Sequence, residues 1–197
     1  MSKIIIFGLS ANPPANHHLL IVQKLIEIFG KVVIIPRGSN SDKPSTTTTT
    51  HDQRKEMVHL VFSGLPHIEI DFSDLDKNIF TPTWMIDQKY KTKFPDSEIW
   101  HAIGGDLIKD GAGGNSEIQT KWQKGSEIWT NLNWAVINHP GLPINPDDLP
   151  PKSMTIKMDS LEGRSTIIRN RLASGQSITD LVPPKVEKYI IKNNLYR

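Results

Sequence analysis

The chain has 197 residues, of which 37% are hydrophobic and 22% charged, and this composition excludes a protein that is disordered throughout. The formal net charge of +2 is too small to indicate a nucleic-acid partner, and the longest apolar runs, residues 4–7 and 19–22, are far shorter than the ~20 residues that span a bilayer. No cysteine is present, which excludes disulfides, a thiol nucleophile and cysteine-bound zinc.

The N-terminal segment predicts a strand, a helix and a second strand. Residues 3–7 form an apolar, β-branched run that ends at Gly8, as expected of a buried parallel strand. Residues 16–29 carry an apolar stripe at helical spacing, and Gly30 follows where helices commonly end. Residues 31–36 form a second buried strand. These three elements predict a βαβ unit with a right-handed crossover and a parallel sheet.

The remaining chain continues to alternate strands with helices. Residues 37–50, which include five consecutive threonines at 46–50, predict a surface loop, and residues 140–151, with five prolines, predict an extended connector. The further helices are expected at residues 54–62, 84–93, 117–129, 165–174 and 184–193. The further strands are expected at residues 68–72, 98–103, 134–137 and 154–158.

This alternation predicts an α/β fold, a doubly wound (Rossmann-like) parallel sheet with helices on both faces and a small C-terminal helical segment. We expect residues 1–197 to form a single domain, with the C-terminal helical part at about 160–197. In such a sheet, ligands bind beyond the carboxyl ends of the strands.

The turn after the first strand is one candidate phosphate site. It leads into a helix whose first N–H groups are unpaired, and such a helix start attracts phosphate. Gly8 allows a close backbone approach, Ser10 adds a hydroxyl, and His17 and His18 stand at the helix start. The structural alternative is a shaped loop whose histidines only cap the helix, and the turn alone does not decide between the two.

The start of the helix at residue 165 is a second candidate. Ser165 or Thr166 can cap this helix, and Arg169 lies on the same face one turn later. Two hydroxyls, free N–H groups and a guanidinium therefore converge on a space the size of an anion. A capped helix with an arginine in its first turns is also common as a purely structural feature.

Two other features point away from further sites. The glycine-rich residues 111–114 lack the Gly-Lys-Ser/Thr ending of a nucleotide-binding loop and predict a surface loop. The seven histidines lack the spacing of metal ligands, so no protein-bound metal is predicted.

Taken together, these segments resemble the nicotinate/nicotinamide mononucleotide adenylyltransferases of the HxGH-type nucleotidyltransferase superfamily. IIIFGLSANPPANHHL at residues 4–19 is similar to the family's first strand and phosphate-binding turn, and residues 103–106 resemble its I-G-x-D segment. RSTIIRNRL at residues 164–172 resembles the family's ISSTxIRxRL and is the most specific part. Arg54 and Met57 also match, and the resemblance runs nearly from end to end.

The resemblance implies a reaction in NAD biosynthesis. ATP and a pyridine mononucleotide give the dinucleotide and pyrophosphate, through in-line attack of the mononucleotide phosphate on the α-phosphorus of ATP. Mg²⁺ bound with the ATP phosphates is the implied cofactor. The implied partners are ATP and a pyridine mononucleotide, without nucleic acid or membrane, and a homo-oligomer is compatible with the resemblance. We expect a cytoplasmic protein, which the absence of cysteine suits.

The resemblance also implies roles for individual residues. His18 and Arg169 would be catalytic. The implied ATP-binding residues are Gly8, Leu9, Ser10, His18, Gly104, Asp106, Ser165, Thr166 and Arg169. The implied mononucleotide-binding residues are Ser10, Ala11, Lys43, Thr83, Trp84 and Trp122, with Trp122 stacking on the pyridine ring.

Two positions depart from the family pattern. The motif begins with His or Thr and ends with His, but here it reads Ala15, Asn16, His17, His18, so the first phosphate-binding side chain is missing. Loss of one such donor costs about 2.7–4 kcal/mol, or roughly 10²–10³ in rate. His17, one helical position from His18, is expected to point elsewhere and to be a poor geometric substitute for the missing side chain. His139 stands where an arginine before Pro-Gly is common.

Three functions are compatible with these observations. An active adenylyltransferase is favoured. The alternatives are a nucleotide-binding homologue whose catalysis is weakened or lost through Ala15, and an enzyme for another phosphate acceptor such as phosphopantetheine or a sugar-alcohol phosphate. Trp122 and the long C-terminal match argue against the last. The choice between nicotinate and nicotinamide is left open.

Overall fold

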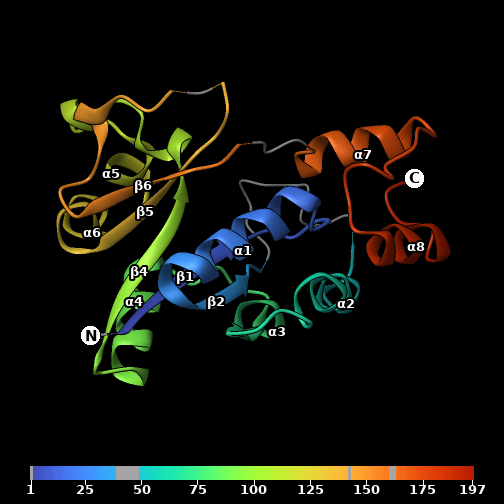
Figure 1. Cartoon of the computed structure of the whole chain (residues 1–197), viewed down its shortest axis with the longest axis horizontal. Coiled ribbons are helices and arrows are strands. Elements are labelled where there is room, and N and C mark those ends of the chain that lie inside the picture. The colour runs from blue at the N-terminus through green and yellow to red at the C-terminus, as the bar shows by residue number, and fades with distance from the viewer. Residues whose placement is uncertain (1, 39–48, 142, 160–162) are drawn as a thin grey trace.

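The computed structural model describes residues 2–38, 49–141, 143–159 and 163–197. Within these residues, six parallel strands form one sheet in the order β3-β2-β1-β4-β5-β6 (Figure 1). The strands are β1 (Ser2–Leu9), β2 (Gly30–Pro36), β3 (Ile68–Ile70), β4 (Ser97–Gly104), β5 (Asn133–Asn138) and β6 (Ser153–Lys157). The helices are α1 (Asn16–Phe29), α2 (His51–Phe62), α3 (Ser73–Lys77), α4 (Thr83–Lys93), α5 (Glu117–Lys121), α6 (Gly125–Asn131), α7 (Ser165–Ala173) and α8 (Pro184–Lys192).

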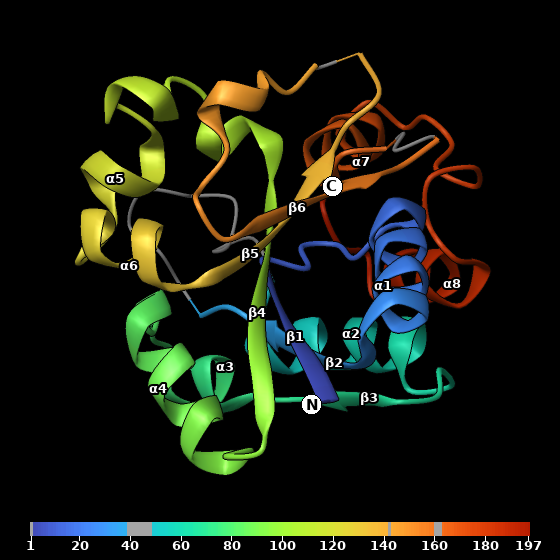
Figure 2. The same cartoon turned by 60° about the vertical axis from the view of Figure 1, so that its left-hand side comes forward.

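Different helices cover the two faces of the sheet, because successive side chains of a strand point to opposite faces. On β1, Ile5 and Phe7 join a buried cluster with α1, α2, α7 and α8, whereas Ile4 and Ile6 pack with α4. Another cluster joins β5 to α5 and α6. Figure 2 shows α1 and α8 on one side of the sheet and α4 and α6 on the other. The predicted doubly wound parallel sheet is confirmed.

The strand order reverses beside β1. The chain proceeds from β1 to β2 and β3 in one direction, and β4, β5 and β6 extend the sheet in the other. The helices that follow β1 and β4 lie on opposite faces of the sheet, so a crevice opens between the carboxyl ends of these two strands. Leu9 ends β1 and Gly104 ends β4, which places the two predicted ATP-binding turns on either side of this crevice.

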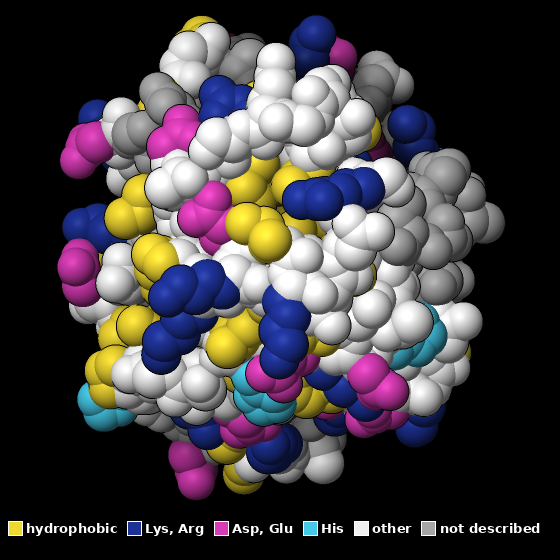
Figure 3. Space-filling view, turned by 90° about the vertical axis from the view of Figure 1, so that its right-hand side faces the viewer, with side chains coloured by type: hydrophobic (Ala, Val, Ile, Leu, Met, Phe, Trp, Pro, Cys, Tyr) yellow, Lys and Arg dark blue, Asp and Glu magenta, His cyan; other side chains and the backbone are white. Residues whose placement is uncertain are grey.

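The predicted C-terminal helical segment is present and packs on the core. Ile168 of α7 and Val186 of α8 belong to the same buried cluster as Leu25 of α1. The Asn16 backbone N–H, at the start of α1, donates to the Leu181 carbonyl at 2.9 Å. Figure 3 shows this end of the molecule, where basic and acidic side chains are interspersed. Across the described ranges, no helix is both long and apolar enough to cross a membrane.

The single helix predicted over residues 117–129 is wrong, because the chain forms α5 and α6 with a break between them. Trp122 is extended, and Lys124 has a φ of 57° in the left-handed region. Gly125 permits the close packing of the two helices, since a Cβ there would lie 2.2 Å from the Ile118 carbonyl oxygen. The helical periodicity of the segment does not reveal this turn.

Smaller differences have local causes. Helix α2 begins three residues before the predicted start, because Thr50 and Gln53 cap it reciprocally through their side chains and backbone N–H groups. Helix α3 was not predicted. The proline-rich connector, predicted to be extended, contains one turn of 3₁₀ helix at Pro146–Asp148, where the Asn145 side chain accepts from the Asp147 N–H.

Candidate active site

The first helix starts beside a histidine whose hydrogen bonding is defined. Ala15 occupies the N-cap of α1 and offers no side-chain acceptor. Its backbone N–H donates to His18 Nδ1 at 3.0 Å, so the proton of the neutral ring is on Nε2. Burial and the neighbouring His17 hold the pKa of His18 well below its usual range. At neutral pH, His18 is therefore a neutral donor through Nε2–H at an uncapped helix start.

The start of α7 lies directly on the β1–α1 turn. Ser165 Oγ donates to the Pro13 carbonyl at 2.9 Å, and Arg169 Nη1 donates to the Asn12 carbonyl at 2.7 Å. Arg169 Nη2 also donates to Thr166 Oγ1 at 3.1 Å. Two segments about 150 residues apart in the chain, both chosen from the sequence as phosphate sites, are thus in contact. Their roles remain predictions.

The other predicted ATP-binding residues line the same edge of the sheet. A Cβ on Gly104 would approach Oδ1 of the exposed Asp106 side chain to 2.4 Å, so a larger residue there would displace this carboxylate. Gly8 is exposed at the end of β1, and a Cβ would make only an ordinary contact with Arg37, at 3.5 Å. Internal packing therefore does not require glycine at residue 8, whereas a side chain at residue 104 would move the Asp106 carboxylate. Leu9 is buried and Ser10 half-buried.

Arg54 supports this turn and was not among the predicted site residues. It is fully buried, and its Nη2 donates to the carbonyls of Ser10 and Arg37. Its Nε and Nη1 have no hydrogen-bond partner in the described part of the chain. Burial lowers its pKa to about 10. The sequence held one signal for this residue. Arg54 lies on the inner, apolar face of a predicted helix, in line with Met57, where a charged side chain is unusual.

The C-terminal tail also reaches the turn. Tyr196 donates its hydroxyl to Asn12 Oδ1 at 2.5 Å, and Thr49 Oγ1 donates to the same oxygen at 2.9 Å. Tyr196 was not among the predicted site residues. Because Asn12 precedes the uncapped start of α1, the end of the chain helps to hold the candidate phosphate turn in place.

The predicted mononucleotide-binding residues fall into two groups. Ala11 is buried in the β1–α1 turn, beside Ser10. Thr83 and Trp84 begin α4, and the Lys124 ammonium lies 4.2 Å from the centre of the Trp84 ring. Trp122 and Trp84, both half-buried, pack against the same apolar cluster. Lys43 lies outside the described residues.

The expectation that His17 points away from His18 is wrong. Their ring centres are only 3.8 Å apart. Side chains on a helix lean towards its N-terminus, so two long side chains in the first turn can meet beyond the helix end. The His17 pKa falls from 6.5 to about 4, chiefly because of burial, and the positive charges of His139 and Arg164 lower it further, while the Gly163 backbone acts in the opposite sense.

This lowered pKa makes a prediction about stability. Between about pH 6.5 and pH 4, the unfolded chain binds a proton at residue 17 that the folded protein does not, so the free energy of unfolding falls as the pH is lowered. By pH 4 the loss from this group is about 3 kcal/mol. We expect His17→Gln, which cannot titrate, to flatten this part of the curve in urea unfolding from pH 7.5 to pH 4. Equal slopes in both proteins would contradict the prediction.

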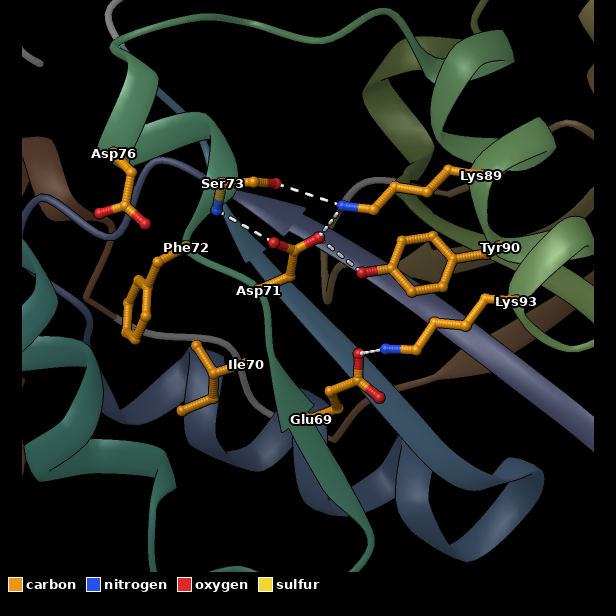
Figure 4. A pocket seen from close by; sticks show the side chains of 9 residues that line it. All are labelled: Glu69, Ile70, Asp71, Phe72, Ser73, Asp76, Lys89, Tyr90 and Lys93. Carbon is orange, nitrogen blue, oxygen red and sulfur yellow. Dashed lines mark hydrogen bonds and ion pairs between the residues drawn. The ribbon is translucent and has the colours of Figure 1, made fainter.

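A separate pocket, on the outer side of edge strand β3 and α4, contains none of the predicted site residues (Figure 4). Its charged groups are already paired. Asp71 Oδ2 accepts from Lys89 at 2.6 Å and from the Tyr90 hydroxyl at 2.7 Å, and Glu69 pairs with Lys93. These bonds hold the pKa of Asp71 well below its usual range against the opposing effect of burial. The pocket is a satisfied ion-pair cluster and offers no free group to a ligand.

The fold and the crevice at β1 and β4 define an α/β protein with a doubly wound parallel sheet and two helix starts at its candidate site. The chain belongs to the cytidylyltransferase-like family, whose sequence pattern matches residues 6–171.

Relatives carry a more particular name. The curated nicotinate-nucleotide adenylyltransferase of Bacillus subtilis (strain 168) is 26% identical over 198 residues, which cover 100% of this chain and 99% of the relative. The Plasmodium falciparum nicotinic acid mononucleotide adenylyltransferase complexed with NaAD superposes with a TM-score of 0.80 at 22% identity, over 100% of this chain and 98% of that one. A putative nicotinate-nucleotide adenylyltransferase from Vibrio parahaemolyticus gives a TM-score of 0.66 at 24% identity, over 100% and 96%. The two structures confirm the fold.

Proposed function

We propose that this protein is a nicotinate-nucleotide adenylyltransferase, which transfers the adenylyl group of ATP to nicotinate mononucleotide and releases pyrophosphate. The observation that carries the proposal is the contact of the α7 start with the β1–α1 turn, which brings Arg169, Ser165 and the His18 Nε2–H to one edge of the sheet. The similarity over the whole chain to relatives that bear this name supports the choice of reaction.

In this proposal, ATP lies in the crevice between β1 and β4. Ser165, Thr166 and Arg169 bind the β- and γ-phosphates, and Gly104 and Asp106 border the adenosine. His18 donates its Nε2–H to the triphosphate and stabilises the negative charge that develops as the mononucleotide phosphate attacks the α-phosphorus. The protein forms no covalent intermediate, because positioning and charge stabilisation suffice for this class of transfer.

We propose that Mg²⁺ enters the site with ATP. Among the described residues there is no group of three or more His, Asp or Glu side chains that could hold a metal. Mg²⁺ is commonly bound through substrate phosphates in such sites, and it supplies charge neutralisation there. The protein's own part is to hold the phosphates with neutral N–H donors and the Arg169 guanidinium.

We further propose that residues 1–197 act as a single nucleotidyltransferase domain in the cytoplasm. The C-terminal helices share a buried cluster with α1 and β1, which supports one cooperative unit. A reaction that consumes ATP in NAD synthesis suits the cytoplasm.

The test is pyrophosphate release from ATP and Mg²⁺ with nicotinate mononucleotide, nicotinamide mononucleotide, phosphopantetheine or no acceptor. We expect release that depends on nicotinate mononucleotide. Calorimetry that detects ATP binding, without release in the presence of either mononucleotide, would instead indicate a binding homologue. Release with phosphopantetheine alone would indicate another acceptor.

The base of the mononucleotide provides a further prediction. We expect Trp122→Ala to raise the KM for nicotinate mononucleotide about tenfold or more, because a stacked aromatic ring contributes roughly 1–3 kcal/mol per base. The KM for ATP should change little. Trp122→Phe, which retains an aromatic face, serves as the matched control and should stay within about threefold. An unchanged mononucleotide KM in Trp122→Ala would remove Trp122 from the site and favour a different acceptor.

A further inference from the structure

The side chain of His17 is buried at the candidate site with a polar atom left unpaired. It is 8% exposed, and its Nδ1 has no hydrogen-bond partner among the residues that the structure describes. Buried polar atoms in native proteins nearly always have a partner, so such an atom needs an explanation. A ligand that supplies the missing partner is one.

The groups around His17 define the chemistry of that ligand. The ring lies 3.8 Å from His18 and is hydrogen-bonded to the Gly163 backbone, and the charges of Arg164 and, when it is protonated, of His139 act on it. Arg164 occupies the N-cap of α7 without a side-chain hydrogen bond to that helix. Two helix starts therefore meet beside a histidine pair and a guanidinium. The Asp106 carboxylate acts on His139, but no carboxylate is among the side chains that act on His17 itself. This environment favours an anion with several oxygens.

We propose that His17 provides the phosphate-binding donor that Ala15 lacks, with Nδ1 bound to an oxygen of the ATP triphosphate. The inference rests on the proposed function for the identity of the ligand. His17 is thus a substrate-binding residue. Aligning residues 15–18 with the family motif does not reveal it, because the motif has no histidine at the third position.

The surroundings of residue 15 support the substitution. Ala15 is fully buried within the main apolar cluster. A larger side chain at residue 15 would have to displace packed neighbours. The chain therefore places its imidazole two positions later, where the first helical turn carries the side chain back towards the helix start.

Binding by His17 has a consequence for protons. In the free protein the ring is neutral, since its pKa is about 4. A triphosphate beside the ring favours its charged form, so the His17 pKa rises when ATP binds. Nδ1 then takes up a proton from solvent, and the resulting N–H donates a hydrogen bond to a phosphate oxygen. His18 lies against His17, the charges of His139 and Arg164 act on it, and the Asp106 carboxylate acts on His139. Because the other two histidines can also titrate, the contribution of His17 must be isolated by substitution.

The experiment is calorimetry of ATP and Mg²⁺ binding at pH 6.5, without mononucleotide, in two buffers of different ionisation enthalpy. We expect His17→Ala to weaken ATP binding about 10- to 100-fold and to reduce the number of protons taken up. His17→Gln keeps the size and a neutral donor, so it should bind ATP more tightly than His17→Ala but show the same reduced proton uptake. His59→Ala, on the exposed face of α2, is the matched control and should behave as the wild type.

Unchanged affinity and unchanged proton uptake in folded His17→Ala or His17→Gln would overturn the proposal. Tighter ATP binding by an Ala15→His variant that retains His17 would also overturn it. Such a gain would mean that the wild-type site lacks a phosphate donor, which the proposal says His17 already supplies. Binding that depends on His17, in a protein that transfers no adenylyl group to a pyridine mononucleotide, would support the inference while refuting the proposed function.

Discussion

We expect His18→Ala to lower kcat by roughly 10²–10³-fold, because it removes a preorganised N–H donor from the developing charge. The effect should fall mainly on kcat, since a donor used most strongly in the transition state contributes less to substrate binding. The variant also loses the bond from the Ala15 N–H to Nδ1, which costs about 1 kcal/mol of folding free energy. Steady-state kinetics and urea unfolding of the same preparation separate the two effects.

His59→Ala is the control for this comparison. His59 is exposed on α2, and its ring lies 5.0 Å from that of Phe72, just before α3. It should retain kcat within about twofold. A His18→Ala enzyme with nearly normal kcat would show that the Nε2–H does not act on the reacting phosphate.

The second large effect is expected at Arg169. Arg169→Ala should lower kcat/KM for ATP by about 100-fold, because it removes a charged donor and also releases the turn, whose Asn12 carbonyl accepts from the guanidinium at 2.7 Å. Arg169→Lys keeps the charge but loses the forked geometry, so it should recover only part of the activity. Initial rates at varied ATP concentration measure both variants.

Arg171→Ala, two residues later on α7, is the matched control. Its guanidinium pairs with Asp180 at 3.1 Å on the exposed surface, where a single ion pair stabilises little. Activity should remain within about twofold of the wild type. Equal losses in Arg169→Ala and Arg171→Ala would mean that α7 is sensitive to any change, and that Arg169 has no particular role at the phosphates.

The arrangement of the sheet could be predicted from the sequence because its signals are local. The buried runs at β1, β2, β4 and β5 consist of consecutive apolar residues, and β1 and α1 end close to the predicted positions, before Ser10 and at Gly30. Parallel pairing then follows from the alternation of strands with helices. The first turn and the start of α7 were both chosen from the sequence as candidate phosphate sites at the carboxyl edge of such a sheet, but the contact between them was not predicted.

Other features depend on packing between distant residues, which a linear pattern does not contain. The break before α6 is set by the left-handed Lys124 and by Gly125 against the Ile118 carbonyl, and neither disturbs the helical periodicity. The burial of Arg54 beneath Ser10 depends on α2 packing under the turn. The orientation of His17 depends on how side chains at a helix start lean, so counting helical positions alone placed it wrongly.

His17 also bears on the meaning of Ala15. Comparison of the motif alone raises the possibility of a binding protein that has lost its chemistry. The structure instead places the His17 imidazole beside His18, with an Nδ1 that has no partner in the described part of the chain, so in our proposal the number of phosphate-binding groups at the helix start is not reduced. We therefore expect substantial turnover by the natural protein, without the 10²–10³-fold loss that a missing donor would cause.

The most direct test of this account follows the α-phosphate itself. ATP labelled at the α-phosphorus is incubated with Mg²⁺, the protein and nicotinate mononucleotide, and the products are separated by chromatography. The account predicts that the label appears in nicotinate adenine dinucleotide, in a stoichiometric ratio to the pyrophosphate released, and that it does so only when the mononucleotide is present. Label that remains in ATP, or that appears in AMP regardless of the mononucleotide, would contradict it.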